Sequence, residues 1–500
     1  MKRWASSVSV LLLLAGVVII AVGPPGAQAA TASASGTQPV IAVSDHTTCA
    51  IRESYRVYCF GVNSSGELGR GSTTPSTAVL PVAVTLTDAV AIYGANVARG
   101  EGGRFCALRI DRTVACWGEG TYYMIGNTTS ADVLVPTTVP GLTNVASVSM
   151  GEVNSCFVKQ DGTVWCLGFA TLITGTLATS PTQIAALSSV TGVAVGAEHA
   201  CALKADKTVW CWGKGLEGEL GNGAYGSSAS PVMVKGLTDA SAVVAGQYHT
   251  CALRTTGAVV CWGANDNGRL GHVPIPTSGD SPVPLSVTDL SGVQSLSAGL
   301  ANTCAVTSSA VRCWGAGSGH VLGDTQTSDQ FAPVGAIVSL PKATQVAGGD
   351  QHNCEVADGG KVWCWGVATA GEMGNGTAGS YPEGAGPGNA FGTALAPRSI
   401  PIKNSAPGKP TGSSKAAKKV TVTWTAPSTS NGTSAPKDYV VYYQLKGSST
   451  WKKFTDSVST SRSTTVTGLS SGTYYRFKVV PVNWAGTGTA SAISGYIKVR

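Results

Sequence analysis

The chain has 500 residues, of which 12% are charged and 43% hydrophobic, so it does not belong to the highly charged, disordered class of proteins. Its 64 glycines favour turns and short strands over helices, and its 14 cysteines exceed what a typical cytosolic enzyme carries. The net charge of +7 is modest, but it is unevenly distributed.

The first 29 residues have the organisation of a secretory signal peptide. Lys2 and Arg3 precede an apolar run from Val8 to Val22, and Ala27-Gln28-Ala29 offers small residues for cleavage after Ala29. A membrane anchor is the alternative, but this run of 15 residues is shorter than the ~20 that a spanning helix needs. We therefore expect a secreted protein, extracellular or associated with the cell wall, with no integral membrane segment after cleavage.

The cysteines form seven regularly spaced pairs. The two members of a pair lie ten residues apart in six cases and nine in one, and the first member recurs about every 51 residues. Such a period predicts an array of stacked units. The pairs are Cys49 and Cys59, Cys106 and Cys116, Cys156 and Cys166, Cys201 and Cys211, Cys251 and Cys261, Cys304 and Cys313, and Cys354 and Cys364.

Each unit reads as four short strands. Residues between the paired cysteines alternate around a turn such as 160–162, which is typical of a β-hairpin. A loop with Glu-Leu-Gly follows, as at 219–221, and a strand containing proline closes the unit, as at 230–234. Four strands per unit, repeated radially, predict the blades of a propeller.

These motifs resemble the regulator of chromosome condensation repeat, and the context is similar to that of the family's secreted bacterial members. The resemblance rests on His-Thr-Cys-Ala-Leu at 249–253, Cys-Trp-Gly at 261–263 and Gly-Arg-Leu-Gly at 268–271. It covers residues 38–402 and implies a seven-bladed β-propeller, a rigid disc that presents loops to a partner. The copies differ: the motifs read Cys59-Phe60-Gly61 in blade one, Met124-Ile125-Gly126 in blade two and Cys166-Leu167-Gly168 in blade three, and a Gly/Pro-rich insertion spans 371–397.

The repeated side chains are interpreted first as structural. Cysteines facing each other across a hairpin, such as Cys201 and Cys211, favour disulfides over free buried thiols, and the Cys-x-x-Cys spacing of metal sites is absent from the sequence. The tryptophan before each glycine is expected to fill space between blades rather than to bind carbohydrate, and the glycine to take a positive φ. His199, His249 and His352 precede their cysteines by two residues, and we expect them to fix the backbone rather than to bind metal.

The last hundred residues form a second module without cysteine. Residues 404–410 read as a linker, and 411–500 alternate in the manner of a β-sandwich. This segment resembles a fibronectin type III domain, which implies that Trp424 is the core tryptophan and Tyr475 the tyrosine of its corner. The whole chain is thus predicted to be all-β, a seven-bladed propeller followed by an immunoglobulin-like sandwich.

No motif for a serine nucleophile, a phosphate loop or a zinc protease is found in the sequence. We therefore predict no catalytic residue, no cofactor and no metal, although a pair of distant carboxylates would leave no sequence signature. The first hypothesis is a monomeric binding protein for an extracellular protein or cell-wall polymer. The second is a carbohydrate-active enzyme or an accessory protein in extracellular polysaccharide degradation.

The two modules differ in charge: residues 404–500 carry +11 and residues 30–403 carry −6. A basic module attracts polyanions such as anionic polysaccharide, although a spacer that docks on its own acidic propeller is equally compatible with these charges. The least repetitive loops are the expected contact sites, with solvated loops of no function as the alternative. The candidates are Tyr122, Tyr123, Glu217, Glu219, Tyr381 and Glu383 in the propeller, and Trp451, Lys452, Lys453 and Trp484 in the second module.

Overall fold

The computed structural model describes residues 32–33, 40–52, 55–95, 102–126, 129–169, 177–273, 279–308, 310–324, 326–334, 343–357, 362–367, 369–374, 388–389, 406–427, 436, 438–483, 486–487 and 489–500. Tyr381, Glu383 and Trp484 lie outside these ranges. Among the described residues, no helix is long and apolar enough to cross a membrane.

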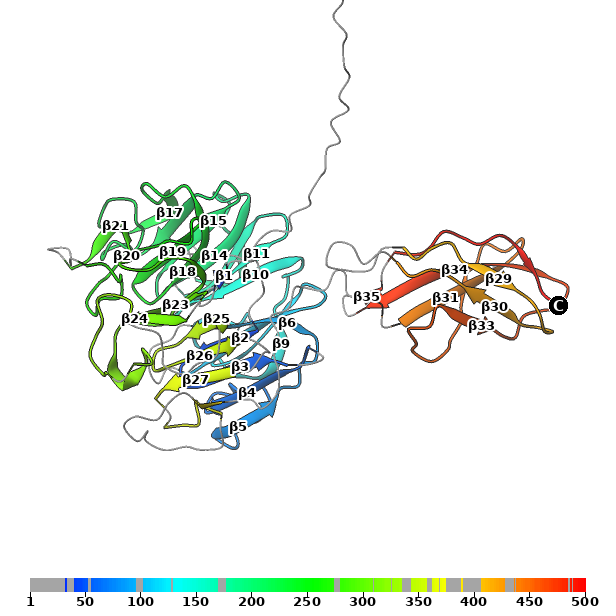
Figure 1. Ribbon diagram of the computed structural model, residues 1–500, viewed down its shortest axis with the longest axis horizontal. Coiled ribbons are helices and arrows are strands. Elements are labelled where there is room, and N and C mark those ends of the chain that lie inside the picture. The colour runs from blue at the N-terminus through cyan, green and yellow to red at the C-terminus, as the bar shows by residue number, and fades with distance from the viewer. Residues whose placement is uncertain are drawn as a thin grey trace, which may run out of the picture.

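Over these ranges the first part of the chain forms seven antiparallel sheets that succeed one another around a ring (Figure 1). In six of the seven sheets the strands pair in chain order, so that each of these blades is built from one continuous segment. Blade one contains β2 (Ile41–Ser44), β3 (Thr47–Ile51), β4 (Val57–Val62) and β5 (Thr77–Ala83). Blade two contains β6 (Ala89–Gly94), β7 (Arg104–Arg109), β8 (Val114–Gly118), the short 3-10 helix η2 (Thr121–Tyr123) and β9 (Val133–Thr138). Blade three contains β10 (Val145–Met150), β11 (Asn154–Lys159), β12 (Val164–Gly168) and β13 (Ala178–Gln183).

The remaining four blades follow the same order. Blade four contains β14 (Val190–Val195), β15 (His199–Lys204), β16 (Val209–Gly213) and β17 (Ser228–Met233), and blade five contains β18 (Ala240–Ala245), β19 (His249–Arg254), β20 (Val259–Gly263) and β21 (Ser281–Ser286). Blade six contains β22 (Val293–Ala298), β23 (Asn302–Thr307), β24 (Val311–Gly315) and the 3-10 helix η3 (Ser318–His320). Blade seven contains β25 (Ala343–Gly348), β26 (His352–Ala357), β27 (Val362–Gly366) and β28 (Gly388–Asn389). The two-residue strand β1 (Ala32–Ser33) pairs with β22 and so lies at the edge of the sixth sheet beside its first strand, opposite to the edge where the other blades have their fourth strand.

The paired cysteines lie opposite each other on the second and third strands of every blade. In blade four, for example, Cys201 is the cross-strand partner of Cys211. All 14 cysteines form disulfides within their own blades, with Cα atoms 4.0–4.1 Å apart across each pair. This separation belongs to the closer kind of antiparallel pair, in which the two residues do not exchange hydrogen bonds. The predicted pairing is confirmed.

We expect peptide mapping of the unreduced protein to recover all seven links. Replacing Cys201 and Cys211 together by alanine should lower the free energy of unfolding by ~2.5–3 kcal/mol, because the bridge closes a loop of about ten residues in the unfolded chain. Denaturant titration measures this difference. Unlinked cysteines in most blades, or a double variant as stable as the parent, would contradict the structural role of the bridges.

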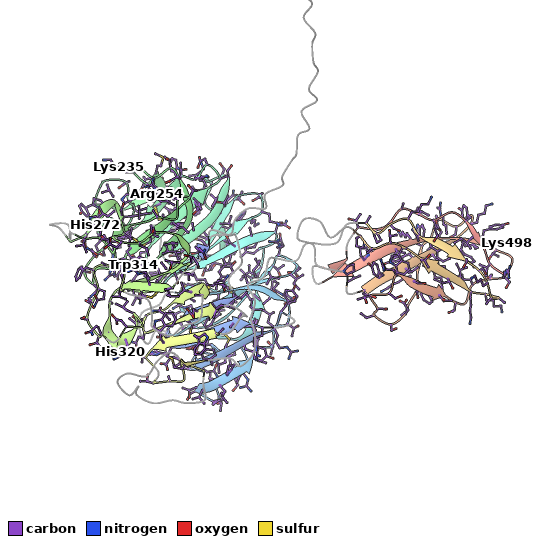
Figure 2. All side chains as sticks on the ribbon, in the orientation of Figure 1. Lys235, Arg254, His272, Trp314, His320 and Lys498 are labelled. Atoms are coloured by element: carbon purple, nitrogen blue, oxygen red, sulfur yellow. A yellow bond between two sulfur atoms is a disulfide. The ribbon has the colours of Figure 1, made fainter. Side chains whose placement is uncertain are left out.

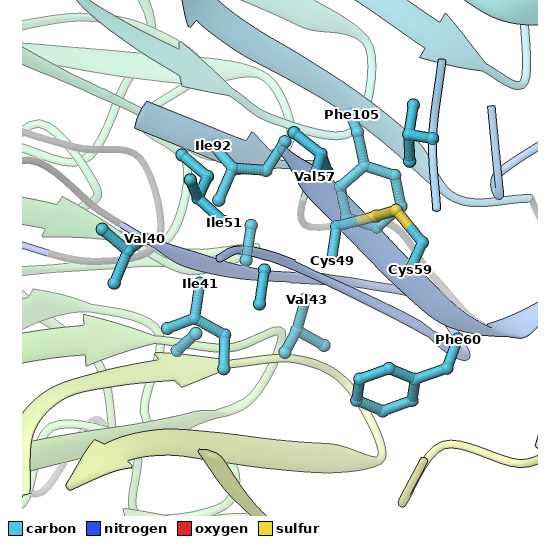
Figure 3. Packing of buried hydrophobic residues seen from close by; sticks show 14 of the residues in the cluster. Val40, Ile41, Val43, Cys49, Ile51, Val57, Cys59, Phe60, Ile92 and Phe105 are labelled. Carbon is cyan, nitrogen blue, oxygen red and sulfur yellow. A yellow bond between two sulfur atoms is a disulfide. The ribbon is translucent and has the colours of Figure 1, made fainter. Parts of the chain in front are cut away.

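In six of the seven blades an aromatic side chain follows the second cysteine and packs on the blade before it; blade three has Leu167 in this position. Trp117, Trp212, Trp262 and Trp314 are fully buried, each in a cluster with residues of the preceding blade. Figure 3 shows one such boundary, where Phe105 of blade two lies in one cluster with the Cys49–Cys59 disulfide of blade one. The interpretation of these tryptophans as filler between blades is confirmed.

The preceding blade also holds the indole by a hydrogen bond. The Nε1 atoms of Trp117 and Trp262 donate to the carbonyl oxygens of Glu67 and Glu219, both at 2.8 Å. Trp314 and Trp365 donate in the same way to carbonyl oxygens of blades five and six. The loop that ends in Leu-Gly after the third strand therefore holds the tryptophan of the next blade in the ring.

The glycine after each second cysteine has φ between +102° and +125° in all seven blades, as the sequence predicted. At Gly263 an added Cβ would also collide with the carbonyl oxygen of Tyr248. Both constraints exclude other residue types, because side chains disfavour this φ and the backbone of the neighbouring strand leaves no space.

Side chains close the ring between blades seven and one. The N–H of Val40 donates to Oε1 of Gln345 at 3.1 Å, and Thr48 Oγ1 is hydrogen-bonded to His352 Nε2 at 2.7 Å. Phe60 takes the place of the tryptophan in blade one, and Gly374 of blade seven lies against its ring. Closure thus keeps the aromatic packing between blades, but without the indole hydrogen bond that a tryptophan donates.

The C-terminal module forms two antiparallel sheets. One contains β29 (Thr411–Ser413), β30 (Val420–Thr423) and β33 (Ser463–Val466), and the other β31 (Asp438–Leu445), β32 (Lys452–Lys453), β34 (Tyr474–Asn483), β35 (Gly486–Thr487) and β36 (Ile497–Lys498). Trp424 lies in their common core, where its ring packs edge-on against Tyr439 at 5.3 Å. Tyr475 Oη accepts the N–H of Ser470 at 3.3 Å, which is the contact expected of a tyrosine corner.

Candidate functional site

Propeller topology gathers two kinds of connection at one end of the disc. Neighbouring strands are antiparallel, so the connections from first to second strand and from third to fourth strand lie at the same end. We call this end the hub face, and the opposite end, which carries the hairpin turns between the paired cysteines, the turn face. Loops that differ between blades thus share one surface with the loops around the axis.

The hub face is strongly acidic. The described connections at this end contain 14 acidic residues, against the cations Arg70, Lys214 and Arg269. The described connections of the turn face are nearly balanced instead, with five Lys and Arg residues and six Asp, and the adjoining strand ends add Arg109, Lys159, Lys204, Arg254 and Arg312. The acidic residues of the hub face are Asp45, Glu67, Glu119, Asp132, Glu152, Glu198, Glu217, Glu219, Asp266, Asp280, Asp324, Asp329, Asp350 and Glu372.

A buried arginine ties two blades together at this face. Arg104 Nε donates to Glu119 Oε2 at 2.6 Å, and its Nη1 donates to the carbonyl oxygen of Glu152 in blade three at 2.7 Å. The side chain of Glu152 in turn accepts a hydrogen bond from Gln247 Nε2 of blade five at 3.0 Å. Because these contacts bridge three blades, they hold the loops around the axis in a fixed arrangement.

Glutamates of the Glu-Leu-Gly loops are buried and shape the loops that carry them. The carboxylates of Glu67 and Glu219 accept the N–H groups of Ser65 and Glu217 at 2.9 and 2.8 Å. Burial raises the pKa of both carboxyls. In blade seven burial acts on Glu372 in the same direction, but the hydrogen bond from His46 at 2.7 Å, backbone hydrogen bonds and the nearby His352 together outweigh it and lower the pKa of Glu372.

The structure corrects one predicted contact residue and leaves others open. Glu219 is buried, so it forms the loop and is not available at its tip. Glu217 is half-buried on the hub face, where burial and the nearby Asp280 raise the pKa of its carboxyl. Tyr123 is half-buried at the end of η2 and has φ of +62°, and Tyr122 is its neighbour in the same turn. Their role in binding stays a prediction.

The three repeated histidines join blades by their side chains. His199 Nε2 is hydrogen-bonded to Thr250 Oγ1 at 2.9 Å, and His249 is bonded in the same way to Thr303 at 2.8 Å. We expected bonds to the backbone, but the partner is a threonine one position before the first cysteine of the next blade. Within the described ranges, no three His, Cys, Asp or Glu side chains come together as metal ligands.

These histidines make the propeller sensitive to acid. Burial lowers the pKa of His199 and of His352 to about 4, and that of His249 well below its usual value of 6.5. Below pH 6.5 the unfolded chain binds protons that the folded chain binds only near pH 4, so stability falls across this window. The protonation of each of His199 and His352 should lower the free energy of unfolding of the protein by about 3 kcal/mol between these two pH values.

His199→Asn is the variant that tests this sensitivity, because blades three and six carry asparagine in the same position. The variant should lose less stability than the parent between pH 6.5 and 4, as measured by urea unfolding at several pH values. Parallel curves for the two proteins would show that His199 is protonated equally in the folded and unfolded states.

Glu355 is a buried carboxyl between blades six and seven. It follows the first cysteine of blade seven, where five other blades have alanine, and its side chain is fully buried. Neither carboxyl oxygen has a hydrogen-bond partner among the described residues. Burial raises its pKa to about 8, so the group is neutral in the folded protein at pH 7.

Replacement of Glu355 should therefore stabilise the protein in alkali. The folded state keeps its proton up to about pH 8 while the unfolded chain releases it near 4.5, so the parent loses stability as pH rises through this window, by up to about 5 kcal/mol. Glu355→Gln preserves the volume and Glu355→Ala restores the residue of the other blades. Unfolding at pH 5 and 9 should show a smaller loss in both variants, and an unchanged loss would contradict the assigned pKa.

Sequence reasoning did not find a hollow of about 560 Å³ on the turn face. It is lined by blades three to five, with Lys159, Lys204 and Lys207 among its residues. Lys159 and Lys204 also lie 4.3 and 5.5 Å from the ring centroids of tryptophans on the adjacent strand. The sequence does show a lysine at the end of the second strand in blades three and four. The repeat spacing alone, however, does not show that these two lysines line the same hollow.

In the C-terminal module the structure separates the predicted contact residues. Lys453 is the cross-strand partner of Tyr442 and Lys452 that of Tyr443, so the two lysines point to opposite faces of their sheet. Trp451 is half-buried, with Lys478 Nζ 4.6 Å from its ring centroid. Lys452 therefore does not share a surface with Lys453 as the sequence suggested.

Comparison with known proteins agrees with this architecture. The family model of the regulator of chromosome condensation (RCC1) repeat matches residues 206–253 and 256–306, a second model of the same repeat matches 190–219 and 240–269, and the fibronectin type III domain model matches 405–495. No curated protein matches the sequence significantly.

Solved structures share the propeller fold at low identity. Prp20p from Saccharomyces cerevisiae, described with its binding properties to Gsp1p and histones, is 20% identical with a TM-score of 0.56, and the match covers 63% of this chain and 81% of that one. Human WBSCR16 is 19% identical with a TM-score of 0.54, over 65% of this chain and 92% of that one. The chain thus contains regulator of chromosome condensation repeats within residues 190–306 and a fibronectin type III domain over 405–495, and its first part shares the propeller fold of these structures.

Proposed function

We propose that this chain is an exported, non-enzymatic binding protein with two binding surfaces. The hub face of the propeller recognises a protein or cell-wall ligand, and the basic fibronectin type III domain contacts an anionic polymer. The observation that carries this proposal is the separation of charge: an acidic hub face on one domain and a net charge of +11 on residues 404–500 of the other.

The fixed hub loops support recognition of a partner that is basic at its contact surface. The contacts of Arg104 and Gln247 hold these loops in place before binding, which lowers the entropic cost of association. Opposite charge speeds the encounter and selects among partners. Propellers of this fold are described as binding proteins: Prp20p in relation to Gsp1p and histones, and yeast RCC1 in a complex with Kap60.

The proposal of export rests on the first 29 residues and on the disulfides. A basic start, a short apolar run and a small-residue cleavage site are the parts of a signal peptide. Seven disulfides persist in an oxidising compartment and are rare in a reducing one.

Affinity capture from culture medium and cell-wall extract tests the role of the hub face. Glu198→Gln combined with Glu217→Gln removes two hub charges, and Asp161→Asn combined with Asp289→Asn removes two charges from the turn face as a matched control. We expect the hub variant to lose most of the captured partner, identified by mass spectrometry, and the control to retain it.

Equal capture by both variants would overturn the assignment to the hub face. A reducing-sugar assay on common polysaccharides covers the enzymatic hypothesis in parallel. Sugar release that one carboxylate substitution abolishes would replace the binding role by a hydrolytic one.

A further inference from the structure

The outer face of the larger sheet in the fibronectin type III domain carries an ordered grid of cations and aromatic rings. On β31 and β34 the core takes Tyr439, Val441, Tyr475, Phe477 and Val479, so that the residues between them face outward. The outward residues of β31, β32, β34 and the chain around β36 are the ones that form the grid.

Strand register arranges these residues in three rows. The first row contains Lys453, Tyr442 and Lys478, which are successive cross-strand partners. In the next row Gln444 is the partner of Arg476, and Trp451 and Tyr496 extend this row by the register of their strands. The third row contains Lys446, Tyr474 and Lys498. Rows two residues apart are separated by ~7 Å, and neighbouring strands by ~4.8 Å.

Cations and rings in the grid hold one another in place. Lys478 Nζ lies 5.4 Å from the ring centroid of Tyr442 and 4.6 Å from that of Trp451. The guanidinium of Arg476 lies between Trp451 and Tyr496, at 5.8 and 5.5 Å. Its Nε also donates to Gln444 Oε1 at 2.7 Å, which fixes the side chain from below. The charges are therefore positioned before any ligand arrives.

Lys446 and Lys498 complete the grid at its third row. Lys446 Nζ lies 5.4 and 5.7 Å from the ring centroids of Tyr474 and Tyr496, and Lys498 Nζ lies 6.0 Å from that of Tyr474. Tyr474 and Tyr496 remain 40% and 45% exposed, and Figure 2 shows Lys498 at the surface of the domain. The grid is thus open to solvent.

The two acidic side chains of this domain lie away from the grid. Asp438 is four residues along β31 from Tyr442, ~14 Å away, and accepts the N–H of Ser459. Asp456 accepts a hydrogen bond from Thr464 of the other sheet at 2.8 Å. Five cations thus face outward with no carboxylate side chain among them in the described part of the domain.

We infer that this grid is a binding site for a linear acidic polysaccharide, whose carboxylates pair with the five cations. The inference rests on the proposed function, which assigns an anionic polymer to this domain, and it names the ligand class and the residues. Single-stranded nucleic acid is the less suitable ligand, because base stacking needs free ring faces and every ring here already has a cation within 6.0 Å of its centroid. Carboxylates on a sugar chain can reach the cations without displacing them from the rings.

The test measures binding of sodium polygalacturonate to the full chain at low and at physiological salt, with dextran as the neutral polymer and a thymidine oligonucleotide as the nucleic acid. Arg476→Gln combined with Lys478→Gln should weaken polygalacturonate binding about tenfold, the loss expected for one charged hydrogen bond or more. Lys446→Gln with Lys498→Gln is a second grid variant. Lys415→Gln with Lys419→Gln removes the same charge from the turn between β29 and β30 and should bind like the parent.

Weaker binding in both grid variants, with the control unchanged and dextran unbound, is the expected result. An equal loss in grid and control variants overturns the site while leaving the polymer-binding role of the domain intact. Absence of polygalacturonate binding at low salt overturns both, and tighter binding of the oligonucleotide than of polygalacturonate assigns the grid to nucleic acid instead. Circular dichroism of each variant confirms that its β-structure is retained.

Discussion

The contact between each blade and the loop of the preceding blade is the constraint on which the propeller depends. A blade of four short strands has two faces and cannot bury both by itself. In six of the seven blades an aromatic residue after the second cysteine covers one face by packing on the preceding blade, and the indole N–H of Trp117, Trp262, Trp314 and Trp365 binds a loop carbonyl there. The glycine that follows has a positive φ in every blade and lets the chain leave the sheet at that point.

The closure of the ring depends most on this contact, because no strand is shared between the first and last blades among the described residues. Blade one contributes Phe60, which has no N–H to donate, and blade seven contributes Gly374 against its ring. Polar contacts make up the difference: Thr48 with His352, Val40 with Gln345, and His46 with Glu372. The disulfides act within blades and therefore stabilise the units without holding the ring together.

The same architecture separates structural charge from accessible charge. Carboxylates such as that of Glu219 are buried and hydrogen-bonded within their own loops, while others at the hub face, such as that of Glu217, remain half-exposed. The fibronectin type III domain distributes its charge differently, since five of its lysines and arginines lie together on the outer face of one sheet. The propeller orders its charged groups by fixing its loops, and the sandwich does so by fixing its cations against aromatic rings. In both domains the charges are therefore in place before a ligand binds.

The sequence by itself determined the seven units, the pairing of the cysteines and the identity of both domains, because these follow from spacing along the chain and from period-2 alternation. It also predicted the burial of the tryptophans and the positive φ of the glycines. It could not determine which side chains meet across blades: the bond of His199 to Thr250 joins residues 51 positions apart. Nor could it show that Glu219 is buried, or that Lys452 and Lys453 face opposite ways, since these depend on loop packing and strand register. The grid around Arg476 was equally hidden, because the four strands β31, β32, β34 and β36 must pair before its cations and rings come together.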